Sequence, residues 1–197
     1  AFWNVYAPGC TEHYLVHVMR SSENFVRELA FVAVADSKIV GCVMFVKGTI
    51  AGDDGVVREV LTLGPIAVLP AYQKKGVGRR LIDHARKEAI RQGYAAIVLC
   101  GDPLYYSRVG FEPAENFGIR TADNKYFVAL QICPLQEKRP ESFAGRYSDD
   151  AVFNISQEAA FEFDQQFLPK DRLENTPSQK RLLEIIEMQR PFDGAKR

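Results

Sequence analysis

The sequence predicts a mixed α/β domain, in which a mostly antiparallel central sheet is flanked by helices. Apolar runs typical of β-strands fill most of residues 28–70, and an Asp-Gly turn signal at 54–55 indicates antiparallel neighbours. From residue 76 the apolar spacing becomes helical. A continuous apolar run at 94–102 is typical of a strand buried on both faces.

The N-terminal part is expected to contain a helix and three strands. Residues 1–9 are interpreted as the last turns of a helix, so we expect an N-terminal strand and part of a helix to be missing from this numbering. A further helix is expected at 12–22. Strands are expected at 28–36, 37–51 and 56–70. The third strand contains Gly64-Pro65, a pair that marks a bulge or a local break.

A long amphipathic helix is expected from Gly76, with Gly93 as its C-cap. On its polar face, Asp83 is spaced to form i,i+4 ion pairs with Arg79 and Lys87. Its apolar stripe consists of Val77, Leu81, Ile82, Ala85, Ala89 and Ile90. This stripe predicts that one side of the helix packs on the sheet.

A short helix at 103–110, with Asp102 as its N-cap, is expected after the buried strand. Two further strands are expected, at 111–119 and 125–134. The composition then becomes more polar. We therefore expect a core domain at 1–134 and a C-terminal extension at 135–197 that packs on this core.

Within the extension, residues 135–150 are interpreted as a loop, 152–155 as a short strand and 178–192 as an amphipathic helix. The apolar residues of that helix, and the aromatic residues of 158–169, must be covered. The apolar stripe of the helix consists of Leu182, Leu183, Ile185 and Ile186. Either the core of the same chain or a second subunit can cover them, so the sequence leaves both a monomer and a homodimer open.

Charge and cysteine spacing exclude several classes of protein. Lys plus Arg and Asp plus Glu both number 25, so the net charge is zero and nucleic acid is not an expected partner. No apolar run is long enough to span a membrane. The cysteines lie too far apart for a clustered metal site, so no metal is expected. Cys42, Cys100 and Cys133 lie in apolar strand-like runs, which predicts buried, reduced thiols in a cytoplasmic protein.

A glycine-rich stretch, Gln73-Lys74-Lys75-Gly76-Val77-Gly78, lies where a strand leads into the long helix. A helix N-terminus presents unpaired N–H groups and a partial positive charge. With glycines beside it, such a terminus can bind a phosphate or pyrophosphate. The stretch matches neither the P-loop nor the three-glycine Rossmann fingerprint. It fits a third template, Gln/Arg-x-x-Gly-x-Gly/Ala.

With its surroundings, this stretch resembles the acetyl-CoA-binding core of the GNAT superfamily of N-acetyltransferases. The resemblance covers roughly residues 28–134, and rests on a strand, Val-x-Pro at 68–70, the glycine-rich stretch, a helix, a buried strand and Tyr-x-x-x-Gly-Phe at 106–111. It implies a GNAT-like acyl-CoA N-acyltransferase fold with a splayed pair of parallel strands, here 61–68 and 95–100. It also implies acetyl-CoA as cosubstrate, with no metal ion.

The resemblance implies which residues bind acetyl-CoA. The strands separate at the Gly64-Pro65 bulge, and the backbone of Ile66, Ala67 and Val68 pairs with the pantetheine arm. The N–H of Val68 faces the thioester carbonyl and stabilises its oxyanion. The pyrophosphate lies on the backbone of the loop and the start of the helix, formed by Gln73, Lys74, Lys75, Gly76, Val77, Gly78 and Arg79.

The implied reaction is direct attack of an amine on the thioester. An alkyl amine has a pKa of roughly 10.4, so a base or a water chain must take its proton. Tyr106, four residues before Gly110, is expected to be the general acid for the leaving thiolate, and Tyr105 is expected to pack. Glu59 is a candidate base, although it equally fits a solvated residue at a strand end.

The three histidines fit packing or surface positions better than catalytic ones. His13 and His17 lie one turn apart on the early helix, where the family often builds its acceptor site, and His84 lies on the long helix. Three functions remain: an active N-acetyltransferase, a catalytically silent acetyl-CoA-binding sensor or partner module, and an unrelated nucleotide-binding protein. The acceptor of the transferase is a small-molecule or peptide amine that the sequence does not name.

Overall fold

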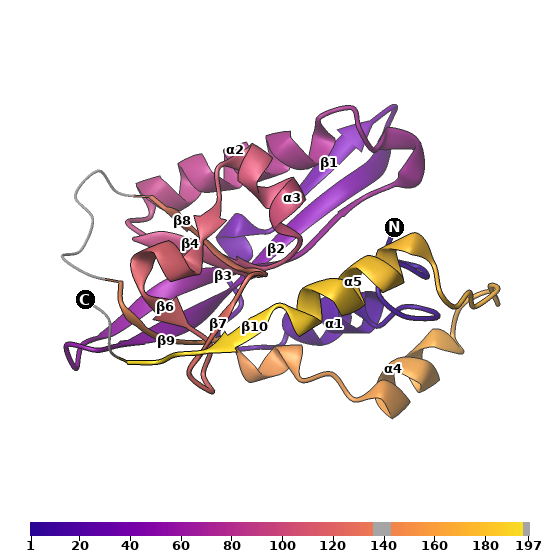
Figure 1. Ribbon diagram of the computed structural model, residues 1–197. Helices are drawn as coiled ribbons and strands as arrows, with labels where there is room; N and C mark the ends of the chain where they lie inside the picture. Colours follow the sequence, from indigo (N-terminus) through magenta and orange to yellow (C-terminus); the bar gives the residue numbers. More distant parts are fainter. Residues whose placement is uncertain (136–142, 195–197) are drawn as a thin grey trace.

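The computed structural model describes residues 1–135 and 143–194, and a single eight-stranded sheet lies at its centre (Figure 1). Seven strands follow the order β5-β8-β4-β3-β2-β9-β6, and β1 pairs with β2. The strands are β1 (Phe31–Ala35), β2 (Lys38–Gly52), β3 (Val57–Val68), β4 (Ala96–Cys100), β5 (Glu112–Pro113), β6 (Ile119–Arg120), β8 (Leu130–Pro134) and β9 (Gly145–Ser148). The β3–β4 and β6–β9 pairs are parallel and the rest are antiparallel, which confirms the predicted fold class.

Helices lie on both sides of this sheet (Figure 1). α2 (Val77–Arg91) runs along one face. The opposite side carries α1 (Glu12–Met19), α4 (Gln157–Asp164) and α5 (Pro177–Glu187). The remaining short elements are α3 (Pro103–Tyr106), η1 (Arg27–Leu29), η2 (Pro70–Tyr72), η3 (Ser107–Val109), η4 (Ala114–Phe117), η5 (Ala151–Phe153), and the two-stranded sheet of β7 (Lys125–Phe127) and β10 (Gln189–Pro191).

The apolar stripe of α2 packs on the sheet as its spacing predicts, apart from one residue. The buried residues of the stripe are Val77, Leu81, Ile82, Ala85 and Ala89. Ile90 is 48% exposed, because one further residue turns the side chain 100° beyond Ala89 and off the buried face. Asp83 lies 3.6 Å from Arg79, as predicted, but its second partner is Arg86 rather than Lys87.

The parallel strands β3 and β4 separate part-way along their length. They pair only at Leu61–Ile97 and Thr62–Val98. In the β2–β3 ladder, Val43 faces Ile66 and Phe45 faces Leu63, so Gly64-Pro65 forms a bulge opposite a single residue of β2. The predicted bulge and the predicted splay are therefore both confirmed. Beyond the bulge, the β4-facing edge of β3 has no ladder partner in the described part of the chain.

Several predicted elements were wrong. Residues 1–9 form turns and bends rather than the end of a helix. The predicted strand at 111–119 contains only the two-residue strand β5 and the first residue of β6, separated by η4. The strand predicted at 125–134 is divided into β7 and β8. The strand predicted at 152–155 is instead η5, because the Asp150 side chain accepts a hydrogen bond from the Val152 N–H and caps a helical turn.

The segment after residue 134 contributes to the sheet, which the loop interpretation did not anticipate. Residues 136–142 lie outside the described residues, but β9 pairs antiparallel with β2 and parallel with β6. Phe143 and Tyr147 are buried against Ile50 and Val60. The division at residue 134 remains a prediction, and β9 places part of the extension within the same core.

The tail helix α5 contacts its own chain through polar groups as well as apolar ones. Gln179 Nε2 donates to the backbone oxygen of Asn4 at 3.2 Å, and Ile185 is buried. Downstream, β10 pairs with β7. Only part of the predicted apolar stripe is covered, since Leu183 is 62% exposed and Ile186 is 47% exposed. The choice between monomer and homodimer therefore remains open.

The four cysteines are all free. Cys133 is buried as predicted and Cys42 is half-buried, but Cys100 is exposed at the end of β4, so its predicted burial was wrong. In residues 1–135 and 143–194, no helix has both the length and the apolar character needed to cross a membrane. The same residues contain no group of three or more His, Cys, Asp or Glu side chains that could hold a metal ion.

Candidate active site

The opening between β3 and β4 exposes a backbone edge that can form hydrogen bonds. The Leu69 N–H donates to Val40 O at 2.9 Å, on the β2 side of β3. Successive residues of a strand direct their N–H groups to opposite edges. The N–H groups of Ile66 and Val68 therefore face the opening, which is where the predicted oxyanion donor must lie.

The glycine-rich loop follows directly and folds back onto this strand. The Gln73 side-chain amide donates to Val68 O at 3.0 Å, which ties the start of the loop to the end of β3. Lys74 and Gly76 both adopt positive φ, at +58° and +78°. An alternation of left- and right-handed residues forms a nest of backbone N–H groups that favours anions.

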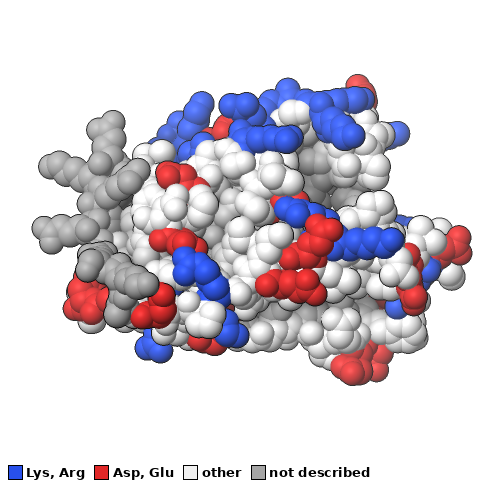
Figure 2. All heavy atoms as spheres, viewed as in Figure 1, with Lys and Arg blue, Asp and Glu red and all other residues white. Residues whose placement is uncertain are grey.

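The N-terminus of α2 completes this nest. Gly76 is its N-cap, and no side chain caps the helix. The N–H groups of Val77, Gly78 and Arg79 cannot bond within the helix, and no other acceptor is found for them among the described residues. A Cβ at Gly76 would meet no atom within 4 Å, so its backbone faces open space. Lys and Arg side chains gather over the α2 side of the molecule (Figure 2).

Tyr105 lies beside this loop. A Cβ on Gly78 would lie 2.7 Å from the Tyr105 hydroxyl and 3.7 Å from Val68 Cγ2. Gly78 therefore provides the space in which the Tyr105 hydroxyl approaches the helix start. Sequence spacing assigned Tyr105 to packing alone, whereas the structure brings its hydroxyl to the predicted pyrophosphate loop.

Tyr106 lies deeper, against the end of β4. A Cβ on Gly101 would lie 2.2 Å from the Tyr106 ring, so only glycine fits there. The ring also packs edge-on to Phe111, with centroids 5.6 Å apart. Burial raises the pKa of Tyr106 far above its ordinary value, and the hydroxyls of Tyr6 and Tyr105 raise it further. The phenol therefore keeps its proton throughout the neutral range.

The helix that carries both tyrosines is held from two directions. The Gln131 amide donates to Gly101 O at 3.0 Å, which fixes the residue after β4. Asp102 caps α3 by accepting from the Leu104 N–H at 3.0 Å, as predicted. From the tail, the Arg181 guanidinium donates to both Asp102 carboxylate oxygens, each at 3.1 Å. A residue of α5 thus fixes the cap of α3.

We expect Arg181→Ala to raise the pKa of the Asp102 carboxyl group toward its ordinary value of about 3.9. In the folded protein the Arg181 hydrogen bonds lower this pKa. A lowered folded-state pKa stabilises the protein above the unfolded-state pKa, and this stabilisation is lost as the pH falls through the lowered value. Carboxyl-carbon NMR titration measures the shift, and melting at several pH values checks that the stability difference disappears in acid.

Glu184→Ala is the matched control for this prediction. Glu184 is the other carboxylate partner of Arg181, at 3.1 Å, and it is not among the groups that shift the pKa of Asp102. Its removal should leave the Asp102 titration in place. An Asp102 pKa that is the same in the wild type and in Arg181→Ala would contradict the proposed tether.

The candidate base Glu59 does not face the opening. It lies on the α2 face of β3, two residues before Leu61, and its carboxylate is 3.1 Å from Lys47 Nζ. Its role as a catalytic base remains a prediction, and the ion pair with Lys47 does not favour that role.

Among the histidines, His13 packs against Phe163 with ring centroids 5.2 Å apart, and His84 packs edge-on to Phe31 at 4.6 Å.

The face of the sheet opposite α2 carries polar residues that the sequence did not single out. The Thr62 and Tyr147 hydroxyls are hydrogen-bonded at 2.7 Å. Cys100 shares this face with Val98, and burial together with the charge of Asp149 raises its pKa to about 12. Cys100 is nevertheless exposed to solvent at the end of β4. β9, the strand that the sequence did not predict, brings Tyr147 to this face, and Asp149 follows directly after β9.

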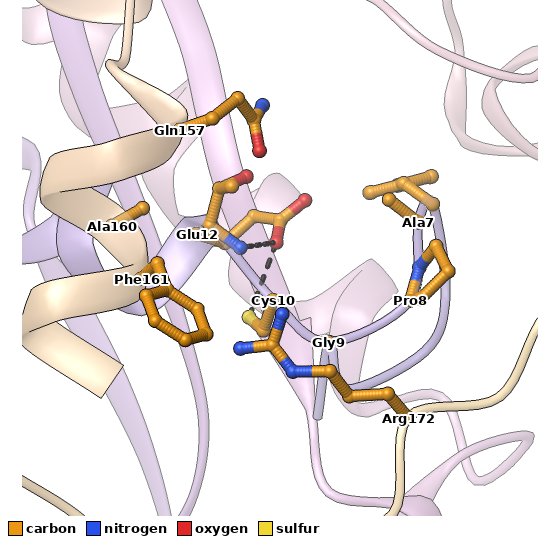
Figure 3. A pocket seen from close by; sticks show the side chains of 11 residues that line it. Ala7, Pro8, Gly9, Cys10, Glu12, Gln157, Ala160, Phe161 and Arg172 are labelled. Atoms are coloured by element: carbon orange, nitrogen blue, oxygen red, sulfur yellow. Dashed lines mark hydrogen bonds between the residues drawn. The ribbon is translucent and has the colours of Figure 1, made fainter. Parts of the chain in front are cut away.

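A separate pocket lies between the N-terminal segment and α4 (Figure 3). Glu12 accepts hydrogen bonds from the Cys10 thiol and the Thr11 N–H, both at 3.2 Å, and Arg172 crosses the opening. The cavity volume of about 50 Å³ holds one or two water molecules. It is too small for an amine substrate. Tyr6 lines it and also lies close enough to Tyr106 to raise the pKa of that phenol.

Comparison with known proteins shows which family the chain resembles. Residues 27–113, which include β1 to β4 and the glycine-rich loop, match the family model described as acetyltransferase (GNAT) domain. This part of the chain, just under half of its length, resembles a GNAT acetyltransferase domain. Two curated Escherichia coli proteins similar to this chain are uncharacterized N-acetyltransferases, YhbS, 34% identical over 110 residues, and YjhQ, 34% identical over 100 residues.

Two solved structures extend the comparison. The GNAT family N-acetyltransferase YhbS of Escherichia coli, in complex with CoA, has a TM-score of 0.65 and 29% identity over 74% of this chain and 78% of that chain. A GNAT acetyltransferase of Brucella melitensis, in complex with acetyl-CoA, has a TM-score of 0.56 and 26% identity over 73% and 78%. This chain spans 63% of the length of curated YhbS and 54% of YjhQ.

Proposed function

We propose that the protein is an N-acetyltransferase that moves an acetyl group from acetyl-CoA to a primary amine by direct attack. One observation carries the proposal. The unpaired edge of β3 after the bulge leads, through the Gln73–Val68 hydrogen bond, into a nest of unpartnered N–H groups at the start of α2. An extended thiol arm can pair with such an edge, and a pyrophosphate fits the nest.

The proposed binding roles follow from this arrangement. The pantetheine arm pairs with the backbone of Ile66, Ala67 and Val68, and the Val68 N–H stabilises the thioester oxyanion. The pyrophosphate lies on the loop and helix start formed by Gln73, Lys74, Lys75, Gly76, Val77, Gly78 and Arg79. The complexes of the YhbS and Brucella melitensis proteins with CoA and acetyl-CoA support this choice of cosubstrate. No metal ion takes part in the proposed reaction.

Tyr106 is the proposed general acid. The bond between the acetyl carbon and the CoA sulfur breaks when the amine attacks, and the thiolate that leaves must gain a proton. A phenol whose pKa is raised by burial holds a proton to donate at neutral pH. Tyr105, whose hydroxyl lies beside Gly78, is assigned to cofactor contact rather than to proton transfer.

A thiol-release assay tests the proposal against a silent acetyl-CoA-binding module. Acetyl-CoA is mixed with spermidine, an aminoglycoside, alanine amide or a peptide with a free N-terminus, and free CoA thiol is measured with time. We expect amine-dependent release for at least one acceptor class. Tight acetyl-CoA binding without release would favour the sensor. Protection from melting by ATP or NAD, but not by CoA, would favour an unrelated nucleotide-binding protein.

The four free thiols fit the cytoplasmic location that we propose.

A further inference from the structure

The proposed reaction needs a group that takes the amine proton, and strand direction points to a candidate. β3 and β9 both run antiparallel to β2, and β4 runs parallel to β3. These three strands therefore run in the same direction, and their C-terminal ends lie toward one end of the sheet. Cys100 is the last residue of β4, and Asp149 follows directly after β9. Cys100 lies two residues beyond the last β3–β4 pair, whereas β9 ends opposite Thr49 of β2, so Asp149 begins the segment that leads from there to the bulge.

The hydrogen bond between Tyr147 and Thr62 identifies the face of the sheet that is relevant here. The Tyr147 hydroxyl reaches across β2 to Thr62, on the face opposite α2. Gly48 leaves the space for this contact, since a Cβ there would lie 2.6 Å from Thr62 Oγ1. Asp149 lies just beyond β9, and the chain continues from it to Phe153, whose ring would lie 3.6 Å from a Cβ on Gly64 at the bulge. The carboxylate of Asp149 is close enough to raise the pKa of Cys100.

Asp149 is free to act on a ligand. It is accessible to solvent although protein covers part of it, and among the described residues it forms no ion pair and no hydrogen bond with another side chain. The titratable groups near it are the Cys100 thiol, the Tyr147 phenol and the Asp150 carboxylate. None of these groups is cationic, so none of them would compete with a cationic ligand for the Asp149 carboxylate. Its neighbour Asp150 is already engaged, since it caps η5 and accepts from Asn24 Nδ2 at 2.6 Å.

We propose that Asp149 binds the ammonium group of the acceptor and takes its first proton. This inference rests on the proposed function. The substrate class is a cationic primary amine, and the carboxylate attracts it to the opening by its charge. Partial burial raises the pKa of Asp149 above its ordinary value, which makes the carboxylate a stronger base.

The proton transfers balance in this scheme. One proton moves from the ammonium to Asp149, and the neutral nitrogen attacks the acetyl carbon. The carbon–sulfur bond breaks, Tyr106 gives its proton to the CoA sulfur, and the attacking nitrogen returns a proton to the Tyr106 oxygen. The products are the N-acetylated amine and free CoA, and Asp149 releases the first proton to solvent.

The test compares Asp149→Asn with Asp150→Asn in the thiol-release assay. For the best acceptor of the panel, we expect Asp149→Asn to lower kcat/KM about 100-fold or more at pH 7, with the KM for acetyl-CoA and the Tm little changed. Asp149→Glu should restore part of the rate, because it keeps a carboxylate. Asp150→Asn should lower the Tm, because it weakens the η5 cap, and keep the rate per folded molecule.

The pH profile separates a base from a merely structural residue. In Asp149→Asn the amine must lose its proton to solvent, so the defect should shrink as the pH rises toward the amine pKa of roughly 10.4. A wild-type rate and pH profile in Asp149→Asn, or a loss that follows the Tm and equals that of Asp150→Asn, would overturn this inference and leave the transferase proposal standing. Absence of amine-dependent thiol release from the wild type would overturn both.

Discussion

Gly76→Asp is expected to lower the affinity for acetyl-CoA by about 100-fold or more, while the fold survives. Gly76 adopts a φ of +78°, and its backbone faces open space at the start of α2. A carboxylate there places negative charge against the proposed pyrophosphate, and like charges brought together cost several kcal/mol. Each factor of ten in affinity corresponds to about 1.4 kcal/mol. Titration calorimetry measures the binding, and circular dichroism checks the fold.

The opposite end of the same helix provides a matched control. Gly93 has a φ of +82°, and a Cβ there would also meet no atom within 4 Å. Gly93→Asp therefore imposes a similar backbone cost of about 1–2 kcal/mol without placing charge in the loop. It should lower the Tm comparably and leave acetyl-CoA binding intact. Equal affinities for Gly76→Asp and the wild type would remove the loop from the proposed site.

Tyr106→Phe is expected to lower kcat by roughly ten- to a thousand-fold, as for the loss of a general acid. The ring keeps its packing against Gly101 and Phe111, so the fold and the KM for acetyl-CoA should change little. Steady-state thiol release measures both parameters.

Tyr105→Phe is the control variant for this prediction. The Tyr105 hydroxyl lies beside Gly78 at the start of α2, so its loss should affect the KM for acetyl-CoA more than kcat. If the two substitutions reduce kcat alike, the choice of acid from the spacing to Gly110 is wrong.

The sequence predicted the elements whose pattern is local and strong. The stripe from Val77 to Ala89 identified α2, and Gly64-Pro65 identified the bulge, because both are properties of neighbouring residues. β9 was not predicted because it lies in a polar stretch. In and just before it, only Phe143, Gly145 and Tyr147 are buried. Its pairing with β2, nearly 100 residues earlier in the chain, has no local pattern.

The candidate site was predictable to the same extent. The hexad from Gln73 to Gly78 is contiguous, so its role in binding an anion could be inferred from the sequence. Asp149 could not be identified from the sequence, because an Asp-Asp pair after a polar stretch is typical of a solvent-exposed surface segment. The Thr62–Tyr147 hydrogen bond and the contact of Phe153 with Gly64, both between residues far apart in sequence, relate it to the splay. Tyr105 was assigned to packing because spacing alone does not show where a hydroxyl points.

The hydrogen bonds that Gln179 donates to Asn4 and that Arg181 donates to Asp102 join residues 175 and 79 positions apart. Contacts of such sequence separation form slowly, because the chain entropy lost on closing a long loop precedes any gain from the contact. The glycine-rich loop depends on near neighbours, such as Gln73 and Val68. During refolding we therefore expect the anion-binding loop to be organised before the tyrosine helix is fixed, so that the chain gains its capacity to hold the cosubstrate earlier than its capacity to turn it over.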